Sequence, residues 1–351
     1  MKDFAFIVHL RSIEDIAHAM PLPKWLLTKL LRRPVLSLFL KLKGRAGFKV
    51  DSSFKIEGEE GSGYIILLWM TGKQVMENPV LARRRILEAA SYARNRLGVE
   101  ILGLGALTAS ITGAGKWVET ELKKRGMNDI TVTHGDTYAT ALATEGVLKI
   151  ALKKGLNIDR SSIAIVGATG IIGEAFTRFF AERFPPRELV LVGRRKGKME
   201  EMAEQFSLQG GKVVTSTDVE AVKGSDIVIT ATSAPESLLS SKHLKEGAMV
   251  YEVSQPRNVS YQVKKERPDI LVIDGAYAKV PDRIRFHWMG LPPGITFGCM
   301  AETIILALGE YNGKNLIGRV NLDLMEEIKR EGSKRGFVIA NPTSFNEPIE
   351  V

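Results

Sequence analysis

The sequence feature that most constrains the fold is a glycine-patterned segment between residues 161 and 183. It reads SSIAIVGATGIIGEAFTRFFAER, in which an apolar run precedes Gly167, Gly170 and Gly173 and a helix-forming run follows them. The first glycine permits a tight turn, the second lets the backbone approach a pyrophosphate, and the third lets the helix lie close to the strand. The helix N-terminus offers N–H groups and a positive dipole to phosphates. The segment therefore predicts a strand–turn–helix unit that binds a dinucleotide, although an ordinary glycine-rich turn is the alternative. The residues assigned to this site are Gly167, Ala168, Thr169, Gly170, Ile171, Ile172 and Gly173.

The turn after the next apolar run indicates which dinucleotide binds. Residues 188–202 read ELVLVGRRKGKMEEM, and the apolar part ends at Arg194, Arg195 and Lys196. A site that prefers NAD usually places Asp or Glu here for the ribose 2′-hydroxyl. Cations would instead pair with a 2′-phosphate, and Arg194 could also stack on the adenine. We predict NADPH as the cofactor, with a solvated basic turn as the alternative.

Three more apolar runs end in polar loops, at 226–235, 248–258 and 270–281. In a doubly wound parallel sheet such loops lie at the carboxyl ends of the strands, where ligands bind. We expect Thr232 and Ser233 to lie on the nicotinamide side of the cofactor. Ordinary turn chemistry would explain these residues equally well.

The N-terminal half alternates in the same way. Residues 4–10 and 100–107 read as strands, 51–70 as two strands around a glycine-rich turn, and 78–98 as a helix that opens with Asn78-Pro79 and ends at Gly98. Residues 130–155 read as a short strand, a polar loop and a long helix. The expected fold class is α/β, with an N-terminal α/β substrate domain followed by a Rossmann-like doubly wound parallel sheet.

The length of 351 residues suggests one large domain or two ordinary ones. We expect a substrate domain over 1–140, the NADP-binding domain over 141–290, and a C-terminal segment over 291–351 that packs back on the first domain. The apolar content of 44% and charged content of 25% are ordinary for a globular protein.

Charge and cysteine content restrict the partners and the compartment. Cys299 is the single cysteine, so an intrachain disulfide is excluded, and no secretory h-region follows Met1. The expected location is the cytoplasm. The net charge of +9 favours an acidic partner. No zinc-ligand cluster or RNA-binding motif is visible in the sequence, so we predict neither a metal site nor nucleic-acid binding.

Residues 22–44, LPKWLLTKLLRRPVLSLFLKLKG, are apolar but carry spaced cations and Pro34. These features argue against a transmembrane helix and predict a basic amphipathic one. It could contact a membrane from the cytoplasmic side, line an apolar channel, or form an ordinary core helix with lysines at its edge.

The last distinctive segment, GITFGCMAETI at 294–304, brings Cys299 to the predicted start of a helix. A lone cysteine is usually a packing residue. A helix N-terminus, however, stabilises a thiolate, and Gly298 removes bulk beside it. Together with a reducing cofactor, this arrangement predicts a nucleophile that forms an acyl-enzyme thioester, with backbone N–H groups of the helix as oxyanion donors.

The segments FAFIVHLRSIEDIAHAM, GLGALTASI, THGDTYATA, IAIVGATGIIGEAF and FGCMAETIILALGEY together resemble the long-chain acyl-[acyl-carrier-protein] reductases. The resemblance runs over nearly the whole chain. It implies NADPH-dependent reduction of a fatty acyl thioester to the aldehyde, with Cys299 as the acyl acceptor. It also implies acyl carrier protein as an acidic partner, with acyl-CoA as the alternative donor, and an enzyme that consumes the aldehyde.

The resemblance leaves the proton donor open. Where the family typically has Asn-Thr-His, this chain has Asp136-Thr137-Tyr138, and a histidine stands upstream at His134. We take His134 and His9 as candidates because they lie on expected active-site loops. Glu302, in the first turn of the Cys299 helix, is the fourth catalytic candidate.

Two other classes stay open: a different kind of oxidoreductase and a sensor that is not an enzyme. The order of domains and the segments GDTYATA and GCMAETIILAL also resemble shikimate dehydrogenases, which act on a hydroxyl substrate without a thiol. Glutamyl-tRNA reductases join a thioester to NADPH, but their cysteine lies in the N-terminal domain. A sensor that binds NADP or an acyl group, in which Cys299 only packs, is the non-enzymatic alternative.

Overall fold

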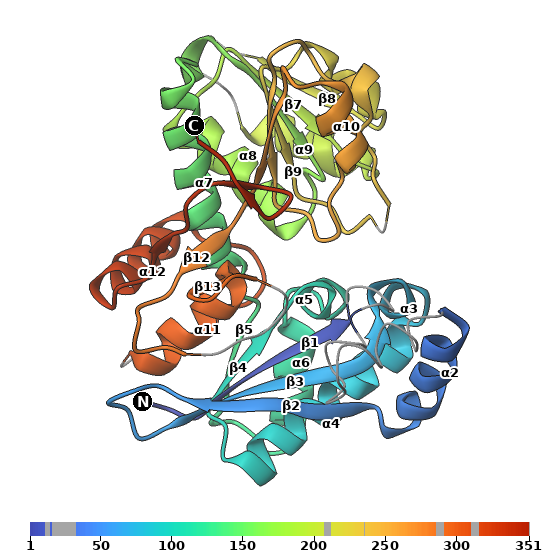
Figure 1. Cartoon of the computed structure of the whole chain (residues 1–351), viewed down its shortest axis with the longest axis vertical. Helices are drawn as coiled ribbons and strands as arrows, with labels where there is room; N and C mark the ends of the chain where they lie inside the picture. The colour runs from blue at the N-terminus through green and yellow to red at the C-terminus, as the bar shows by residue number, and fades with distance from the viewer. Residues whose placement is uncertain are drawn as a thin grey trace. The chain divides into compact units, whose positions relative to one another are not determined.

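The computed structural model describes residues 1–10, 15, 33–206, 212–234, 236–285, 291–309 and 316–350. Segment 12–20, where Ser12 with Glu14 and Asp15 predicts the start of a helix, lies outside the described residues except for Asp15. Residues 22–32 of the basic stretch also lie outside them. The chain forms two compact units (Figure 1). The first comprises Met1–Gly135, Val280–Gly318 and Lys334–Gly336, and the second comprises Asp136–Lys279, Arg319–Ser333 and Phe337–Val351.

The first unit is built on a five-stranded sheet in the order β2-β3-β1-β4-β5. Strands β3, β1, β4 and β5 are parallel, and β2 is antiparallel to β3. Central β1 pairs Phe4 with Gly63 on one side and with Ile101 on the other, and all of its seven residues are buried. The bounds are Phe4–Leu10 for β1, Phe48–Lys55 for β2, Ser62–Thr71 for β3, Ile101–Leu104 for β4 and Thr131–Thr133 for β5.

Helices cover both faces of this sheet. Ile7 faces the cluster that α4 and α6 contribute to, whereas Phe6 and Gly103 point to the opposite face, where Thr303 of α11 packs. Alternation of side chains along the strands produces this two-sided core. The helices of the first unit are α2 (Arg33–Lys43), α3 (Gly72–Glu77), α4 (Pro79–Leu97), α5 (Leu107–Ile111), α6 (Lys116–Lys124) and α11 (Gly298–Leu308).

The helix predicted over 78–98 is confirmed as α4. Pro79 opens it, where the missing N–H costs nothing. Gly98 ends it with φ of 71°, a left-handed conformation that suits glycine. The polar segment that follows β4 contains the short helix α5.

The second unit contains a six-stranded parallel sheet in the order β11-β10-β9-β6-β7-β8. This is a doubly wound sheet, so the predicted α/β class with a Rossmann-like unit is confirmed. Its strands are β6 (Ser162–Val166), β7 (Glu188–Val192), β8 (Lys212–Ser216), β9 (Ile227–Thr230), β10 (Met249–Glu252) and β11 (Leu271–Asp274). Its helices are α7 (Asp136–Lys153), α8 (Ile171–Arg183), α9 (Lys196–Gln205), α10 (Tyr261–Glu266) and α12 (Leu322–Lys334).

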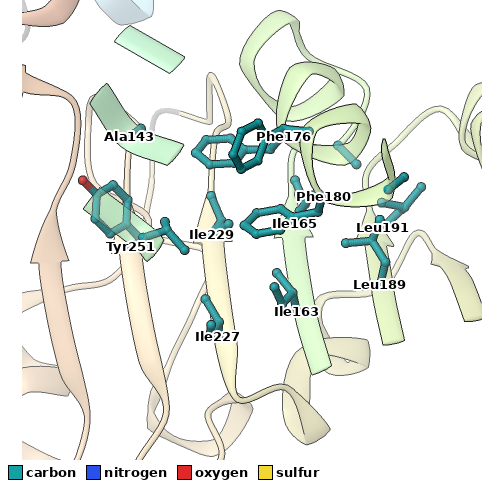
Figure 2. Packing of buried hydrophobic residues seen from close by; sticks show 14 of the residues in the cluster. Ala143, Ile163, Ile165, Phe176, Phe180, Leu189, Leu191, Ile227, Ile229 and Tyr251 are labelled. Carbon is teal, nitrogen blue, oxygen red and sulfur yellow. The ribbon is translucent and has the colours of Figure 1, made fainter. Parts of the chain in front are cut away.

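One core cluster of the second unit lies between its sheet and the helices α7 and α8, and a second cluster lies on the opposite face of the sheet. Figure 2 shows Phe176 and Phe180 of α8 packed near Ile165 of β6 and Ile229 of β9. The two phenylalanine rings stack with centroids 6.2 Å apart. Burial of these large apolar groups fixes α8 on the sheet, and the turn before it is thereby held in place.

Short elements complete the chain. Strand β12 (Tyr277–Lys279) pairs with β14 (Val338–Ile339), and β15 (Thr343–Ser344) pairs with β16 (Glu347–Pro348) in a hairpin. Strand β13 (Ile295–Phe297) precedes α11, and 3-10 helices occupy Gly44–Ala46, Ile158–Arg160, Val219–Gly224 and Ser241–His243. Helix α11 belongs to the first unit, whereas most of α12 and residues 337–351 belong to the second. The domain bounds at 140 and 290 stay a prediction.

Candidate functional site

The glycine-rich turn lies at the switch point of the second sheet, between neighbouring strands β6 and β9. Here the chain connections leave in opposite directions, which opens a crevice at the carboxyl ends of the strands. Gly167 has φ of +91°, and a methyl group on it would lie 2.4 Å from the carbonyl oxygen of Ala231. A methyl group on Gly173 would lie 2.2 Å from the carbonyl oxygen of Gly167. Both positions therefore require glycine.

Helix α8 presents its N-terminus at this turn. Its N-cap residue is Gly170, which has no side chain to bond the first-turn N–H groups. The N–H groups of Ile171, Ile172 and Gly173 have no acceptor within the helix because of their position in it. The side chains of Ala168 and Thr169 are buried, so these residues would offer backbone groups. The turn thus fits a pyrophosphate, and these are the residues that would hold it.

The basic turn after β7 has two distinct parts. Arg194 and Arg195 are both exposed. The Arg195 guanidinium donates from Nε to Thr169 Oγ1 at 3.2 Å and from Nη2 to the Thr169 carbonyl oxygen. Arg195 therefore braces the glycine-rich turn, and its place as a 2′-phosphate ligand stays a prediction, as does that of Arg194.

Two cations that the sequence analysis did not single out also act on this turn. Lys198 Nζ lies 2.7 Å from Glu174 Oε2 on the first turn of α8, and Arg319 Nε lies 2.6 Å from Glu174 Oε1. Arg319 is remote in sequence from both, so no local pattern could have identified it.

The loop after β9 is tied to the loop after β10. The Thr232 N–H donates to Ser254 Oγ at 2.8 Å, and the Thr232 hydroxyl donates to Asn258 Oδ1 at 2.7 Å. Ser233 is half-buried beside it. Both predicted nicotinamide-side residues thus lie at the carboxyl end of β9, next to the glycine-rich turn.

Cys299 lies in the first turn of α11, as the sequence predicted. The helix begins at Gly298, and its N-cap residue, Phe297, makes no side-chain capping bond. The Cys299 side chain is half-buried. A thiol in this position is next to the positive end of the helix dipole, which favours its thiolate form.

Two glycines, Gly103 in β4 and Gly135 after β5, lie against α11. Gly135, with φ of +76°, follows β5, and a methyl group on it would lie 2.3 Å from Cβ of Cys299. A methyl group on Gly103 would lie 2.1 Å from Oγ1 of Thr303. Cys299 is therefore held directly against the loop that follows β5. No local sequence pattern connects either glycine with this helix.

Glu302 lies one turn after Cys299 and is fully buried. The Thr133 hydroxyl donates a hydrogen bond to its carboxylate, and the Gly135 N–H donates to Thr133 Oγ1 at 3.1 Å. These bonds connect the first turn of α11 to the end of β5. Glu302 thus fixes the segment that touches Cys299, which is a structural task; its catalytic role stays a prediction.

His134 is buried between Thr133 and Gly135. Burial lowers its pKa to about 4, although a hydrogen bond with the Gly318 backbone acts in the opposite direction. The imidazole is therefore neutral at neutral pH.

His9 lies at the carboxyl end of β1 and is also buried. Its Nδ1 donates to the Leu10 carbonyl oxygen at 2.7 Å, and its Nε2 accepts from the Leu107 N–H at 3.3 Å. Burial lowers its pKa, and both ring nitrogens are used by the backbone. His9 therefore connects β1 to the loop after β4 at the switch point of the first sheet, and its catalytic role stays a prediction.

The structure brings Cys299, Glu302 and His134 to the end of β5. Strand β1, which carries His9, is separated from β5 by β4. Adjacent strands lie about 4.8 Å apart, so His9 is about 10 Å from the β5 end across the sheet. In the described part of the chain no group of three or more His, Cys, Asp or Glu side chains could hold a metal ion.

Comparison with known proteins shows which family the second unit resembles. Residues 149–274 match the family model described as Shikimate / quinate 5-dehydrogenase. The chain is 25% identical over 272 residues to the long-chain acyl-[acyl-carrier-protein] reductase of Synechococcus elongatus, covering 73% of this chain and 76% of that protein. It is 27% identical over 299 residues to the glutamyl-tRNA reductase of Crocosphaera subtropica, covering 75% and 66%.

The chain is also 26% identical over 260 residues to the aminotransferase PigE of a Serratia species, and this match covers 72% of this chain but only 29% of PigE.

The match to the family model shows that residues 149–274 form an oxidoreductase-type domain similar to shikimate dehydrogenases. The predicted cofactor, NADP(H), is confirmed for this domain. None of the described helices has the length and apolar character that a membrane span requires.

Proposed function

We propose that this chain reduces a long-chain fatty acyl thioester to the aldehyde with NADPH, through an acyl-enzyme on Cys299. The observation that carries the proposal is the placement of the only cysteine in the uncapped first turn of α11, against Gly135. The similarity to the Synechococcus reductase supports the choice of an acyl thioester as substrate.

The Cys299 thiolate attacks the carbonyl carbon of the acyl donor, a new C–S bond forms, and the carrier thiolate leaves and takes a proton. This exchange is nearly isoenergetic, because one thioester replaces another. When bound, NADPH supplies the hydride that reduces the enzyme thioester to a thiohemiacetal. Cleavage of the C–S bond in that adduct releases the aldehyde and restores the Cys299 thiolate.

The first-turn N–H groups of α11 would stabilise the oxyanion in both steps. His134 is neutral at neutral pH, so orientation of the substrate suits it better than proton donation as an imidazolium. Glu302, through Thr133, holds the Gly135 segment against the thiol. His9 would shape the same edge of the sheet from β1.

We propose that the acyl donor is acylated acyl carrier protein, with acyl-CoA as the second option. We also propose that the reaction takes place in the cytoplasm. The net charge of +9 would attract the acidic carrier. The described part of the basic stretch at 22–44 is α2, on which Leu38 and Leu42 are 59% and 57% exposed. These leucines could contact a membrane surface, where a long-chain aldehyde would partition and be passed to a consuming enzyme.

The proposal is tested by following NADPH oxidation with palmitoyl-ACP, palmitoyl-CoA and no acyl donor. We expect oxidation that depends on the acyl donor and yields one aldehyde per NADPH. Cys299→Ala should lower the rate by more than about a thousandfold while NADPH affinity changes less than about twofold. Donor-independent oxidation, or equal rates in the variant, would contradict the proposal.

A second candidate is a dehydrogenase that acts on a hydroxyl group, because the family model that matches residues 149–274 is that of shikimate and quinate dehydrogenases. Such an enzyme would reduce NADP⁺ when given shikimate or quinate, and the Cys299→Ala variant would retain the activity. The acyl reductase predicts no reaction with either compound.

A further inference from the structure

A hairpin near the C-terminus contacts the loop that follows β10 in the second unit. Strands β15 and β16 form this hairpin, and its turn residues Phe345 and Asn346 have φ of 55° and 66°. The loop contains Ser254, Arg257 and Asn258 and follows the buried strand β10. The two segments meet at the Arg257 side chain.

Arg257 connects the hairpin to the sheet. Its Nε lies 2.7 Å from Asp274 Oδ1, and its Nη2 donates to Asn346 Oδ1 at 2.9 Å. Its guanidinium lies 5.2 Å from the centre of the Phe345 ring. The Asp274 side chain is 1% exposed, so this is a nearly buried ion pair with a fixed planar geometry.

The Asp274 carboxylate also accepts hydrogen bonds from the hairpin directly. The Thr343 hydroxyl donates to Asp274 Oδ2 at 2.8 Å, and the Asn346 N–H donates to the same oxygen at 2.7 Å. One carboxylate therefore orders both the hairpin and Arg257. Loss of either partner would leave buried polar groups unsatisfied, and the segments would then rearrange.

The same loop continues toward the cofactor turn. The N–H groups of Asn258 and Val259 donate to Glu252 Oε2 at 2.8 and 3.0 Å. Asn258 Oδ1 accepts from Ser254 Oγ at 3.2 Å and from the Thr232 hydroxyl at 2.7 Å. Thr232 in turn packs near Gly167, whose added methyl would lie 2.9 Å from Cγ2 of Thr232.

These contacts form one continuous path from the hairpin, through Arg257 and Asn258, to the edge of the dinucleotide turn. We propose that the C-terminal hairpin is a positioning clasp for the NADPH site, and that Arg257 is its positioning residue. The clasp acts by fixing Asn258, which holds Thr232 beside Gly167. The inference uses only the NADPH binding of the proposed function and does not depend on the acyl substrate.

The hairpin offers a matched control on its outer side. Lys264 Nζ lies 3.0 Å from Glu347 and 5.7 Å from the centre of the Phe345 ring. Lys264 thus touches the hairpin as Arg257 does, but it belongs to α10 and not to the loop after β10. Removal of its charge should loosen the hairpin surface without moving Thr232.

The experiment measures NADPH affinity by fluorescence titration, and thermal unfolding without cofactor, for four full-length variants. We expect Arg257→Met to weaken NADPH about tenfold and Phe345→Ala about threefold. Phe345→Tyr, which keeps the ring, and Lys264→Met should remain within about twofold of the wild type. A structural effect alone would lower the unfolding temperature and leave the affinity of the folded protein unchanged.

Unchanged NADPH affinity in folded Arg257→Met would overturn the proposal. If that variant does not fold, unchanged affinity in Phe345→Ala would overturn it, and weaker binding that Phe345→Tyr restores would support it. Failure of the wild type to bind NADPH would contradict both the clasp and the proposed function. Weak binding in the variants together with an absence of acyl reduction would leave the clasp standing and contradict the proposed reaction alone.

Discussion

Glycines near the carboxyl ends of the parallel strands have different roles in the two sheets. In the second unit, Gly167 and Gly173 let backbone approach backbone, and the amino end of α8 is left open for phosphates. In the first unit, Gly103 and Gly135 make room for the side chains of α11, including Cys299. The same architecture thus leaves backbone N–H groups open in one unit and makes room for the Cys299 side chain in the other.

The largest expected effect is on NADPH affinity and concerns the glycine-rich turn of the second unit. Gly173→Ala should weaken NADPH binding by more than about a hundredfold, because its methyl would overlap the carbonyl oxygen of Gly167 and displace the turn. Gly197→Ala is the matched control, since nothing lies within 4 Å of the added methyl. Isothermal titration with NADPH measures both. Equal affinity in the two variants would show that the turn does not bind the cofactor.

The next largest effect concerns the contact between Gly135 and Cys299 in the first unit. Gly135→Ala should slow acyl transfer to Cys299 by about a hundredfold, because the methyl would collide with Cβ of Cys299, and it should leave NADPH affinity unchanged. Gly126 has a similar φ of +78° with nothing near it, so Gly126→Ala separates backbone strain from the collision. Stopped-flow measurement of carrier thiol release gives the rate. A loss of NADPH affinity in Gly135→Ala would break the distinction between the two units.

The units also contain buried titratable groups with opposite pH responses. Burial raises the pKa of Glu252 in the second unit to about 7, against hydrogen bonds that lower it, and lowers the pKa of His134 in the first to about 4. Between about pH 4.5 and 7 the folded protein holds a proton on Glu252 that the unfolded chain has lost, so the free energy of unfolding falls as pH rises. For His134 the unfolded chain holds the extra proton between about pH 4 and 6.5, so stability falls as pH falls.

Each group should contribute up to about 3 kcal/mol to the pH dependence. Glu252→Gln should remove the pH dependence of the free energy of unfolding that arises between about pH 4.5 and 7. His134→Gln should remove the dependence that arises between about pH 4 and 6.5. Urea unfolding across this pH range measures both variants against the wild type. Parallel curves for the wild type and Glu252→Gln would mean that Glu252 titrates normally.

The smallest expected effect concerns the 2′-phosphate. Arg194→Ala should reduce the preference for NADPH over NADH by about tenfold, since one charge-assisted contact is removed. Lys212→Ala, at the start of β8 and paired with Glu188, is a control that removes a cation elsewhere on this sheet. Titration of each variant with NADPH and with NADH measures this preference. An unchanged preference in Arg194→Ala would leave the 2′-phosphate to other residues of the turn.

What the sequence could predict was local. The strand, turn and helix around Gly167 are adjacent in the chain, and so are Gly298, Cys299 and their helix, so propensity and glycine spacing were sufficient. The contact of Gly135 with Cys299 and the path from Phe345 to Thr232 join residues more than a hundred positions apart. No single-sequence pattern carries such information. Arg195 illustrates the same limit, because only the structure shows that it braces Thr169.

The central claim is the acyl-enzyme on Cys299, and intact-mass analysis tests it most directly. The protein is incubated with palmitoyl-ACP or palmitoyl-CoA without NADPH, alongside Cys299→Ser. We predict that the wild type gains one palmitoyl group, that NADPH then removes it as the aldehyde, and that the variant gains no group that NADPH removes. An unmodified wild type, or equal NADPH-sensitive adducts on both proteins, would contradict the account.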